Sequence, residues 1–171
     1  MRNLMKLAIV LLFAIATTAV SAQTPKFGHI DIQAIVQIMP ERAAAEAEFN
    51  KFQSDVEDIF GEMQTDYQTK LASFEQLGED ASEIKKTAKI TEIQDIQQRI
   101  QNYQQTAQQQ LQQKQGELLQ PVFVMAEEAI AVVAKEKGLI YVFDIGQKVV
   151  LYKSNESLDL FPLVKTKLGI L

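Results

Sequence analysis

Residues 75–83 read EQLGEDASE, and this stretch decides the fold because it predicts a tight turn between two long helices. Gly78 is placed for a helix C-terminal cap, and Asp80 with Glu83 resembles a capping box that starts a new helix. Long helices joined by so short a turn should pack antiparallel. The sequence therefore predicts a helical hairpin with its tip near residues 76–82.

The helix before the tip is predicted from Glu41 to Leu77, where there is no proline and Gly61 is the only glycine. Pro40 suits the first turn of this helix because its φ angle is fixed. At 1.5 Å per residue the helix would be on the order of 50 Å long. Apolar residues recur every three or four positions and form one narrow stripe: Phe49, Phe52, Val56, Ile59, Phe60, Met63, Tyr67, Leu71, Phe74 and Leu77.

The helix after the tip carries the seam that faces this stripe. Ile93, Ile96, Ile100, Tyr103 and Ala107 follow the alternating three- and four-residue spacing of a coiled coil. Helical spacing continues through QNYQQTAQQQLQQKQ, residues 101–115, which contain nine glutamines and a single charge, although the step from Ala107 to Leu111 is four where the coiled-coil pattern requires three. The tract is therefore predicted to be ordered helix and not a prion-like segment. Pro121 predicts a kink or a junction further on.

The two ends of the chain predict a small body. Residues 26–31 are typical of a strand, and Asp31 can cap a short helix over 32–39. Residues 139–145 and 148–153 predict a β-hairpin, and a short helix should follow near 160–168 with Asp159 as a possible cap. The helical arm, residues 41–119, brings these ends together into one body, residues 24–40 plus 120–171.

This body has about 70 residues, near the lower limit for a self-sufficient core. We expect several bodies to share one core, so the chain should form a homo-oligomer. The alternative is a monomer whose C-terminal helix covers the sheet. The fold class is α+β, mainly α, with the long arm on a small β-body. The residues expected to join the bodies are Phe27, Ile30, Ile32, Ile140, Val142, Val149 and Leu151.

Residues 1–22 have the layout of a secretory signal peptide, with Arg2 and Lys6, an apolar run of about ten residues and a small-residue site ending at Ala22. The alternative, a transmembrane anchor, would need about 20 apolar residues. Cleavage would remove two of the 17 Lys and Arg residues and none of the 22 Asp and Glu residues, which changes the formal net charge from −5 to −7. This charge argues against nucleic acid, anionic membrane or lipopolysaccharide as partners.

No catalytic constellation is visible in the sequence. There is no glycine-rich phosphate loop or nucleophile motif, cysteine is absent, and His29 is the only histidine. His29 lies in an apolar strand, where a packed or surface histidine is expected in place of a general base. We therefore predict no catalytic residue, no metal site and no cofactor.

Two stretches carry a resemblance to a known family. KFGHIDIQAIVQIMPERAAAEAEF, residues 26–49, is similar to the opening strand, short helix and Pro-Glu helix start of the Skp/OmpH-like periplasmic chaperones. LLQPVFVMAEEAIAVVAKEKGLIYVFDIGQKVVLY, residues 118–152, is similar to their closing helix and hairpin. The resemblance implies a homotrimer, in which strands of three subunits form a small barrel and three helical arms surround a cavity.

The resemblance also implies the function: an ATP-independent holdase in the periplasm that binds unfolded outer-membrane proteins. The alternative is a structural or adaptor coiled coil of the cell envelope that binds one folded partner. The glutamines are then either a neutral solvated surface or a cavity wall whose amides bond to a client backbone. The arm residues with which we expect a client to make contact are Phe49, Phe52, Ile59, Phe60, Met63, Tyr67 and Phe74.

Overall fold

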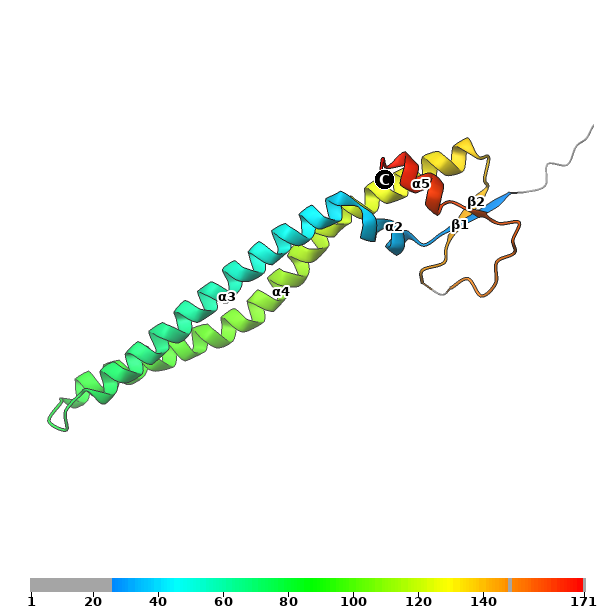
Figure 1. Ribbon diagram of the computed structural model, residues 1–171. Coiled ribbons are helices and arrows are strands. Elements are labelled where there is room, and N and C mark those ends of the chain that lie inside the picture. The colour runs from blue at the N-terminus through cyan, green and yellow to red at the C-terminus, as the bar shows by residue number, and fades with distance from the viewer. Residues whose placement is uncertain (1–25, 148, 171) are drawn as a thin grey trace, which may run out of the picture.

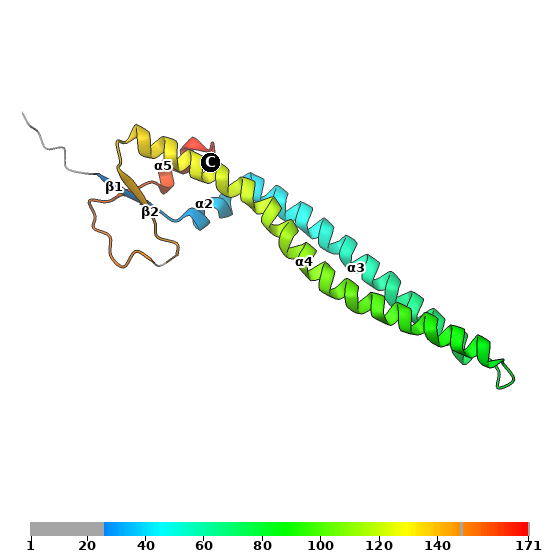
Figure 2. The ribbon, with the colours of Figure 1, turned by 180° about the vertical axis from the view of Figure 1, so that it is seen from behind.

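The computed structural model describes residues 26–147 and 149–170; the predicted signal peptide lies outside them. A long arm of two antiparallel helices, α3 (Pro40–Glu75) and α4 (Glu83–Glu136), extends from a small body at one end (Figures 1 and 2). The body contains β1 (Phe27–Ile30), α2 (Ile32–Ile38), β2 (Tyr141–Asp144), β3 (Leu158–Asp159) and α5 (Phe161–Lys167). The prediction of a mainly helical α+β fold is confirmed.

The helix ends near the body follow the sequence signals. Asp31 caps α2, because its Oδ1 accepts a hydrogen bond from the backbone N–H of Ala34 at 3.0 Å. Pro40 occupies the first turn of α3. Gly138 follows the C-cap of α4 with a φ of 64°, a left-handed conformation that glycine adopts without strain. Asp159 Oδ1 accepts from the N–H of Phe161 at 2.9 Å, at the start of α5.

The helix ends at the tip differ from the prediction. α3 ends at Glu75 with Gln76 as its C-cap, and the positive-φ glycines of the described residues are Gly138 and Gly169, so Gly78 is not the predicted cap. The N-cap of α4 is Ser82, without a side-chain hydrogen bond, so the predicted capping box is wrong. A solvated tip satisfies these backbone groups with water, which removes the need for a cap.

α4 continues through Pro121 for 54 residues and belongs to both parts of the molecule. Its first part packs against α3 in the arm. Its last part turns an apolar face, with residues at spacings of four, three and four, toward α2 and α5: Val122, Ala126, Ala129 and Val133. Pro121 therefore lies within a continuous helix, at the point where its packing partner changes.

The sheet has the order β2-β1-β3, and both outer strands run parallel to β1. β1 pairs with β2 from Phe27–Tyr141 to Ile30–Asp144, and Gly28 and His29 pair with Leu158 and Asp159. The chain between β1 and β2 contains the whole arm, and a long helical crossover of this kind returns the second strand parallel to the first.

The predicted β-hairpin of residues 139–145 and 148–153 is wrong. The second half, described from Val149, forms no strand, and the strand that completes the sheet is the two-residue β3. The β-branched and aromatic residues of 149–153 favour a strand by propensity, but a strand also needs a partner. Within one chain β1 is already paired with a strand on each side, β2 and β3, so it has no free edge for residues 149–153. These residues cross the body as an exposed segment.

The hydrophobic core lies on the helical side of the sheet and joins segments that are far apart in the sequence. Ile30, Ile35, Val36 and Met39 meet the last part of α4, and Leu160 with Val164 closes the core from the C-terminal side. Gly28 allows the close approach, because a Cβ atom there would overlap the side chains of Leu160 and Leu139. Within the described residues, no helix is both apolar enough and long enough to cross a membrane.

Candidate functional site

The middle of the arm carries a groove between α3 and α4. Its largest hollow has a volume of about 990 Å³ and is lined by Phe60, Tyr67, Gln97, Ile100, Gln101 and Gln104, among others. A second, mainly apolar hollow of about 320 Å³ between the two helices shares Phe60 and Gln104 with it. A third, of about 380 Å³, is lined by α4 alone and adjoins the first at Gln101 and Gln104. The three hollows form one surface, which we call the glutamine groove.

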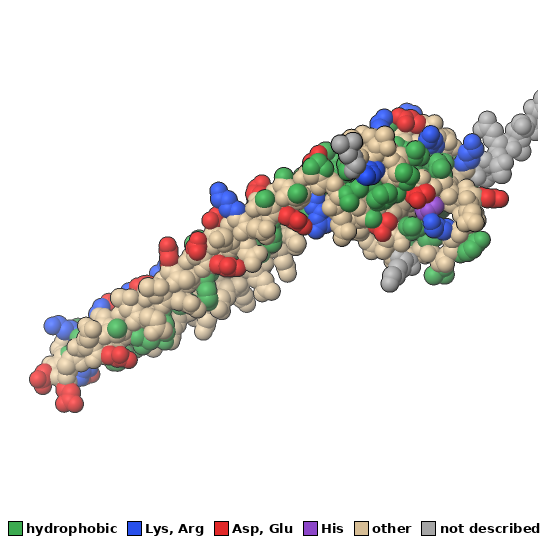
Figure 3. All heavy atoms as spheres, viewed as in Figure 1, with side chains coloured by type: hydrophobic (Ala, Val, Ile, Leu, Met, Phe, Trp, Pro, Cys, Tyr) green, Lys and Arg blue, Asp and Glu red, His purple; other side chains and the backbone are tan. Residues whose placement is uncertain are grey.

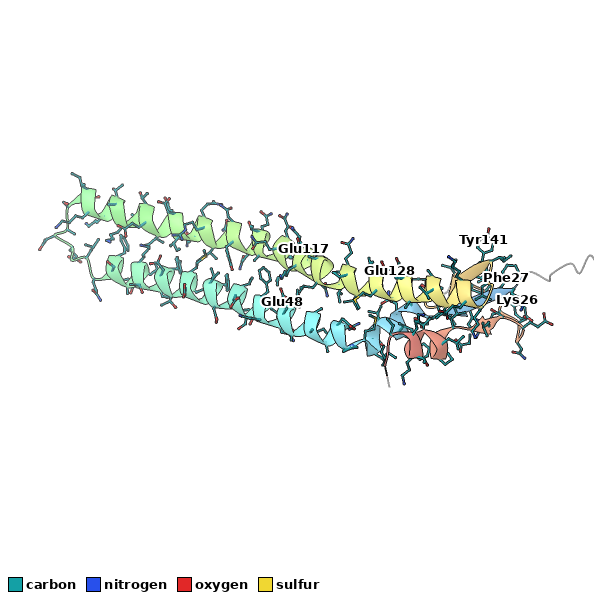
Figure 4. All side chains as sticks on the ribbon, turned by 90° about the horizontal axis from the view of Figure 1, so that it is seen from above. Lys26, Phe27, Glu48, Glu117, Glu128 and Tyr141 are labelled. Carbon is teal, nitrogen blue, oxygen red and sulfur yellow. The ribbon has the colours of Figure 1, made fainter. Side chains whose placement is uncertain are left out.

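The contacts between α3 and α4 explain where the groove lies. Near the tip, Lys70 Nζ lies 3.7 Å from Glu92 Oε2, and near the body Lys114 Nζ lies 2.7 Å from Glu48 Oε1. Glu48 is labelled on α3 in Figure 4. Between these two ion pairs α4 bows away from α3 (Figure 2). Ile96 and Ala107 remain buried in the seam there, so the groove flanks a helix pair that stays in contact.

Two hydrogen bonds cross the seam inside the groove. Gln97 Nε2 donates to the Tyr67 hydroxyl at 2.9 Å, and the Tyr103 hydroxyl donates to the carbonyl of Val56 at 3.1 Å. Partial burial raises the pKa of Tyr103, so its hydroxyl remains a donor at neutral pH. At the tip side, the hydrogen bond from Lys89 and the charge of Lys70 lower the pKa of Glu92, which keeps this carboxylate ionised.

The groove is almost free of charge, whereas the rest of the arm is not. Glu57 is the only charged side chain among the residues that line the three hollows. α4 has no charged residue between Arg99 and Lys114, while α3 carries five acidic and no basic residues between Phe52 and Lys70. Figure 3 shows acidic side chains along the arm above a lower edge that is mainly uncharged. The arm therefore has an acidic side and a neutral side.

The structure brings together only some of the predicted arm residues. Phe60 and Tyr67 line the groove, and Phe60 reaches two of its hollows. Ile59 is 44 % exposed, so the neighbours Ile59 and Phe60 point in different directions. Phe49 lies near the body, beside Leu118 and Leu119, in a separate hollow of about 50 Å³. The other members of the predicted set are half-buried along the arm: Phe52, Met63 and Phe74.

The predicted residue set did not include the glutamines that line the groove. Gln97, Gln101, Gln104 and Gln108 are spaced by four, three and four residues, which places them on one face of α4. That spacing was visible in the sequence. The widening between the helices was not, because it depends on how two long helices bow between their contacts.

The body presents a second surface, on the side of the sheet that faces away from the core. The rings of Phe27, Tyr141 and Phe143 lie 6.1–6.4 Å apart and are 39–64 % exposed. Figure 4 shows Phe27 and Tyr141 together at the end of the body farthest from the arm. Val149, Leu151 and Tyr152 are also strongly exposed, and Leu151 is 97 % accessible. We call these six residues the apolar body face.

The predicted body residues divide between this face and the core. Phe27, Ile140, Val149 and Leu151 are exposed. Ile30 is buried in the core of its own chain, and Ile32 and Val142 pack against that core. In an oligomer, Ile30, Ile32 and Val142 would therefore pack beneath the interface and would not contact a second subunit directly.

Among the residues that the structure describes, His29 is the one buried polar side chain, at 5 % exposure, and its place in β1 puts it on the same side of the sheet as Phe27. Its Nδ1 lies 2.9 Å from Ser157 Oγ, and its Nε2 lies 2.7 Å from Lys153 Nζ. This does not match a nucleophile and its general base, because the ammonium of Lys153 would oppose the imidazolium that such a base must become. Within residues 26–147 and 149–170, no three His, Cys, Asp or Glu residues are grouped to hold a metal ion.

An elongated two-helix arm with an uncharged groove, joined to a small body with an exposed apolar face, defines a tentacle-like architecture. The chain belongs to the OmpH-like outer membrane protein family, whose sequence model matches residues 26–168. Proteins of this family are chaperones and not enzymes, and the family points to outer-membrane proteins as clients. No curated protein matches the chain.

Proposed function

We propose that this protein is an ATP-independent holdase of the periplasm, which binds unfolded outer-membrane proteins in a cavity between helical arms. The observation that carries the proposal is the glutamine groove, a wide and nearly uncharged surface on an arm of a chaperone family. Amide groups can donate to and accept from an extended backbone, and Phe60 offers an apolar contact. Such contacts hold a chain by mass action without chemistry.

The body would form the cavity by joining three copies. Residues 24–40 and 120–171 form the proposed oligomerisation domain, in which the apolar body faces of three subunits pack together. Support comes from the large exposed apolar side chains at the outer end of the body, since monomers rarely leave such a patch uncovered. The segment 149–153 has strand propensity without a partner, and the sheet edge of a second subunit would supply one.

The mature protein, without residues 1–22, is expected to suppress aggregation of an unfolded outer-membrane β-barrel protein diluted from urea, at near-stoichiometric ratio and without nucleotide. Light scattering of the client measures this result. Absence of suppression at every temperature and salt concentration tested would contradict the holdase. A pull-down from envelope extract separates the adaptor alternative: a holdase retains many outer-membrane proteins, and an adaptor retains one folded partner.

Replacing three groove glutamines with glutamate, in the variant Q101E/Q104E/Q108E, is expected to weaken client binding on the order of tenfold. Each lost amide hydrogen bond contributes about 0.5–1.5 kcal/mol, and a tenfold change corresponds to about 1.4 kcal/mol in total. Titration of a fluorescent unfolded client measures the dissociation constant.

The matched control is Q109E/Q110E/Q112E, which adds the same charge to the same helix at positions that line none of the three hollows. This control should bind clients like the wild type. Equal weakening in both variants would mean that general repulsion, and not the groove, sets the affinity. No weakening in either would identify the glutamines as a solvated surface only.

A further inference from the structure

The segment 149–157, which we call the latch segment, is held to the sheet through a buried histidine. His29 is 5 % exposed, and both of its ring nitrogens make contact with this segment. Nδ1 is 2.9 Å from the Ser157 hydroxyl, and Nε2 is 2.7 Å from the Lys153 ammonium. The latch segment also carries Val149, Leu151 and Tyr152 of the apolar body face, so this histidine anchors the segment on which that face depends.

The two contacts fit one tautomer of the neutral ring. A lysine ammonium can only donate, so Nε2 of His29 must be an acceptor. The proton of a neutral ring therefore lies on Nδ1, which donates to the Ser157 hydroxyl. A protonated ring would have N–H groups on both nitrogens, and its Nε2–H would face the Lys153 ammonium at 2.7 Å, where two donors and two positive charges oppose each other.

The other charged groups around His29 are already engaged or offer no direct contact. Asp159 is its register partner on β3, and Asp159 Oδ1 accepts from the backbone N–H of Phe161 at 2.9 Å. Asp31, two residues further on, accepts from the N–H of Ala34. On β2 the register partner is Phe143, which is uncharged. The two carboxylates would favour a charged ring from a distance, but Lys153 opposes it at hydrogen-bond distance.

We propose that His29 is a pH-dependent latch: the neutral ring holds residues 149–157 on the body, and protonation releases them through repulsion of Lys153. A histidine side chain changes charge between about pH 5 and 8, which includes the pH values that an exported protein meets. The closed segment requires the neutral ring, so its stability is present at higher pH and is lost as the pH falls through this range. If the proposed oligomer forms through the apolar body face, low pH would also weaken the association of its subunits. The latch itself does not depend on that oligomer or on clients.

Because His29 is the only histidine in the chain, its ring can be followed by nitrogen-15 NMR without assignment work. At pH 8 the ring should be the Nδ1–H tautomer. NMR relaxation of the backbone amides of residues 149–157, compared with α3 of the same molecule, should show larger fast motion at pH 5.5 than at pH 7.5, because protonation frees the segment. The Nε2–H tautomer, or segment motion that does not respond to pH, would overturn the proposal.

Two variants test the parts of the latch separately. His29→Gln keeps an amide oxygen that can accept from Lys153 but cannot gain a proton, so the pH response of residues 149–157 should disappear. Lys153→Met leaves the histidine but removes the repulsion, so the ring can be protonated while the segment stays closed. If His29→Gln does not fold, Lys153→Met decides alone: an unchanged pH response in that variant would refute the mechanism.

Discussion

Replacing Leu151 with glutamate is expected to convert the proposed trimer into monomers without unfolding the chain. Leu151 is 97 % exposed within its own subunit, so the substitution removes no contact that holds one body together. In a shared body the same position would place three carboxylates in one interface. Like charges brought together across an interface cost several kcal/mol, so the dissociation constant should rise by a factor of about 100 or more.

Light scattering over a series of protein concentrations measures this change, and circular dichroism should remain that of the wild type. The matched control is Ile84→Glu, which makes a similar change at an 83 % exposed position near the tip of the arm. It should leave the mass unchanged. A wild-type protein that is monomeric, or a trimer that survives Leu151→Glu at low micromolar concentration, would contradict the shared body.

Replacing Ile35 with alanine is expected to lower the free energy of unfolding of the body by about 3 kcal/mol, within the range of 2–5 kcal/mol for such truncations. Ile35 is fully buried in α2, where it packs among the core residues of α4 and α5. Its truncation leaves a cavity at the point where three distant segments meet. The body is small, so this loss is a large fraction of its total stability.

Hydrogen exchange along a urea series, followed on peptides from residues 122–133, measures the stability of the body separately from the arm. Ile84→Ala is the matched control, because it is the same substitution on a helix at an exposed site. Its effect should stay within about 0.5 kcal/mol. Equal effects of the two substitutions would mean that the core described above does not hold the body together.

Much of the architecture follows from local signals in the sequence. The repeated three- and four-residue spacing predicts both helices, the turn at EQLGEDASE reverses the chain, and Pro40 and Asp31 mark helix ends as the structure has them. Each of these signals acts between residues that are close in the sequence. They are therefore readable without knowledge of the rest of the fold.

The functional surfaces were less predictable. The sequence predicted the apolar stripe of α3 but not which of its side chains line the groove. In the structure Phe60 lines it, whereas Ile59 points outward. The glutamine tract was identified as ordered helix with two possible roles. Its spacing places it on one face, and the bowing of α4 between two ion pairs then turns that face into part of a groove.

The sequence by itself determined the helical arm, its reversal near residues 76–82 and the mainly helical class, because helical periodicity and its interruption are local. Only the tertiary structure decided the strand pairing, in which β1 takes parallel neighbours on both sides and leaves residues 149–153 outside the sheet. It also decided that His29, an ordinary apolar-strand histidine by sequence, lies between Ser157 and Lys153. The physical reason is the same in both cases: strand partners and buried polar contacts join residues more than 100 positions apart, and no local pattern encodes which of them will meet.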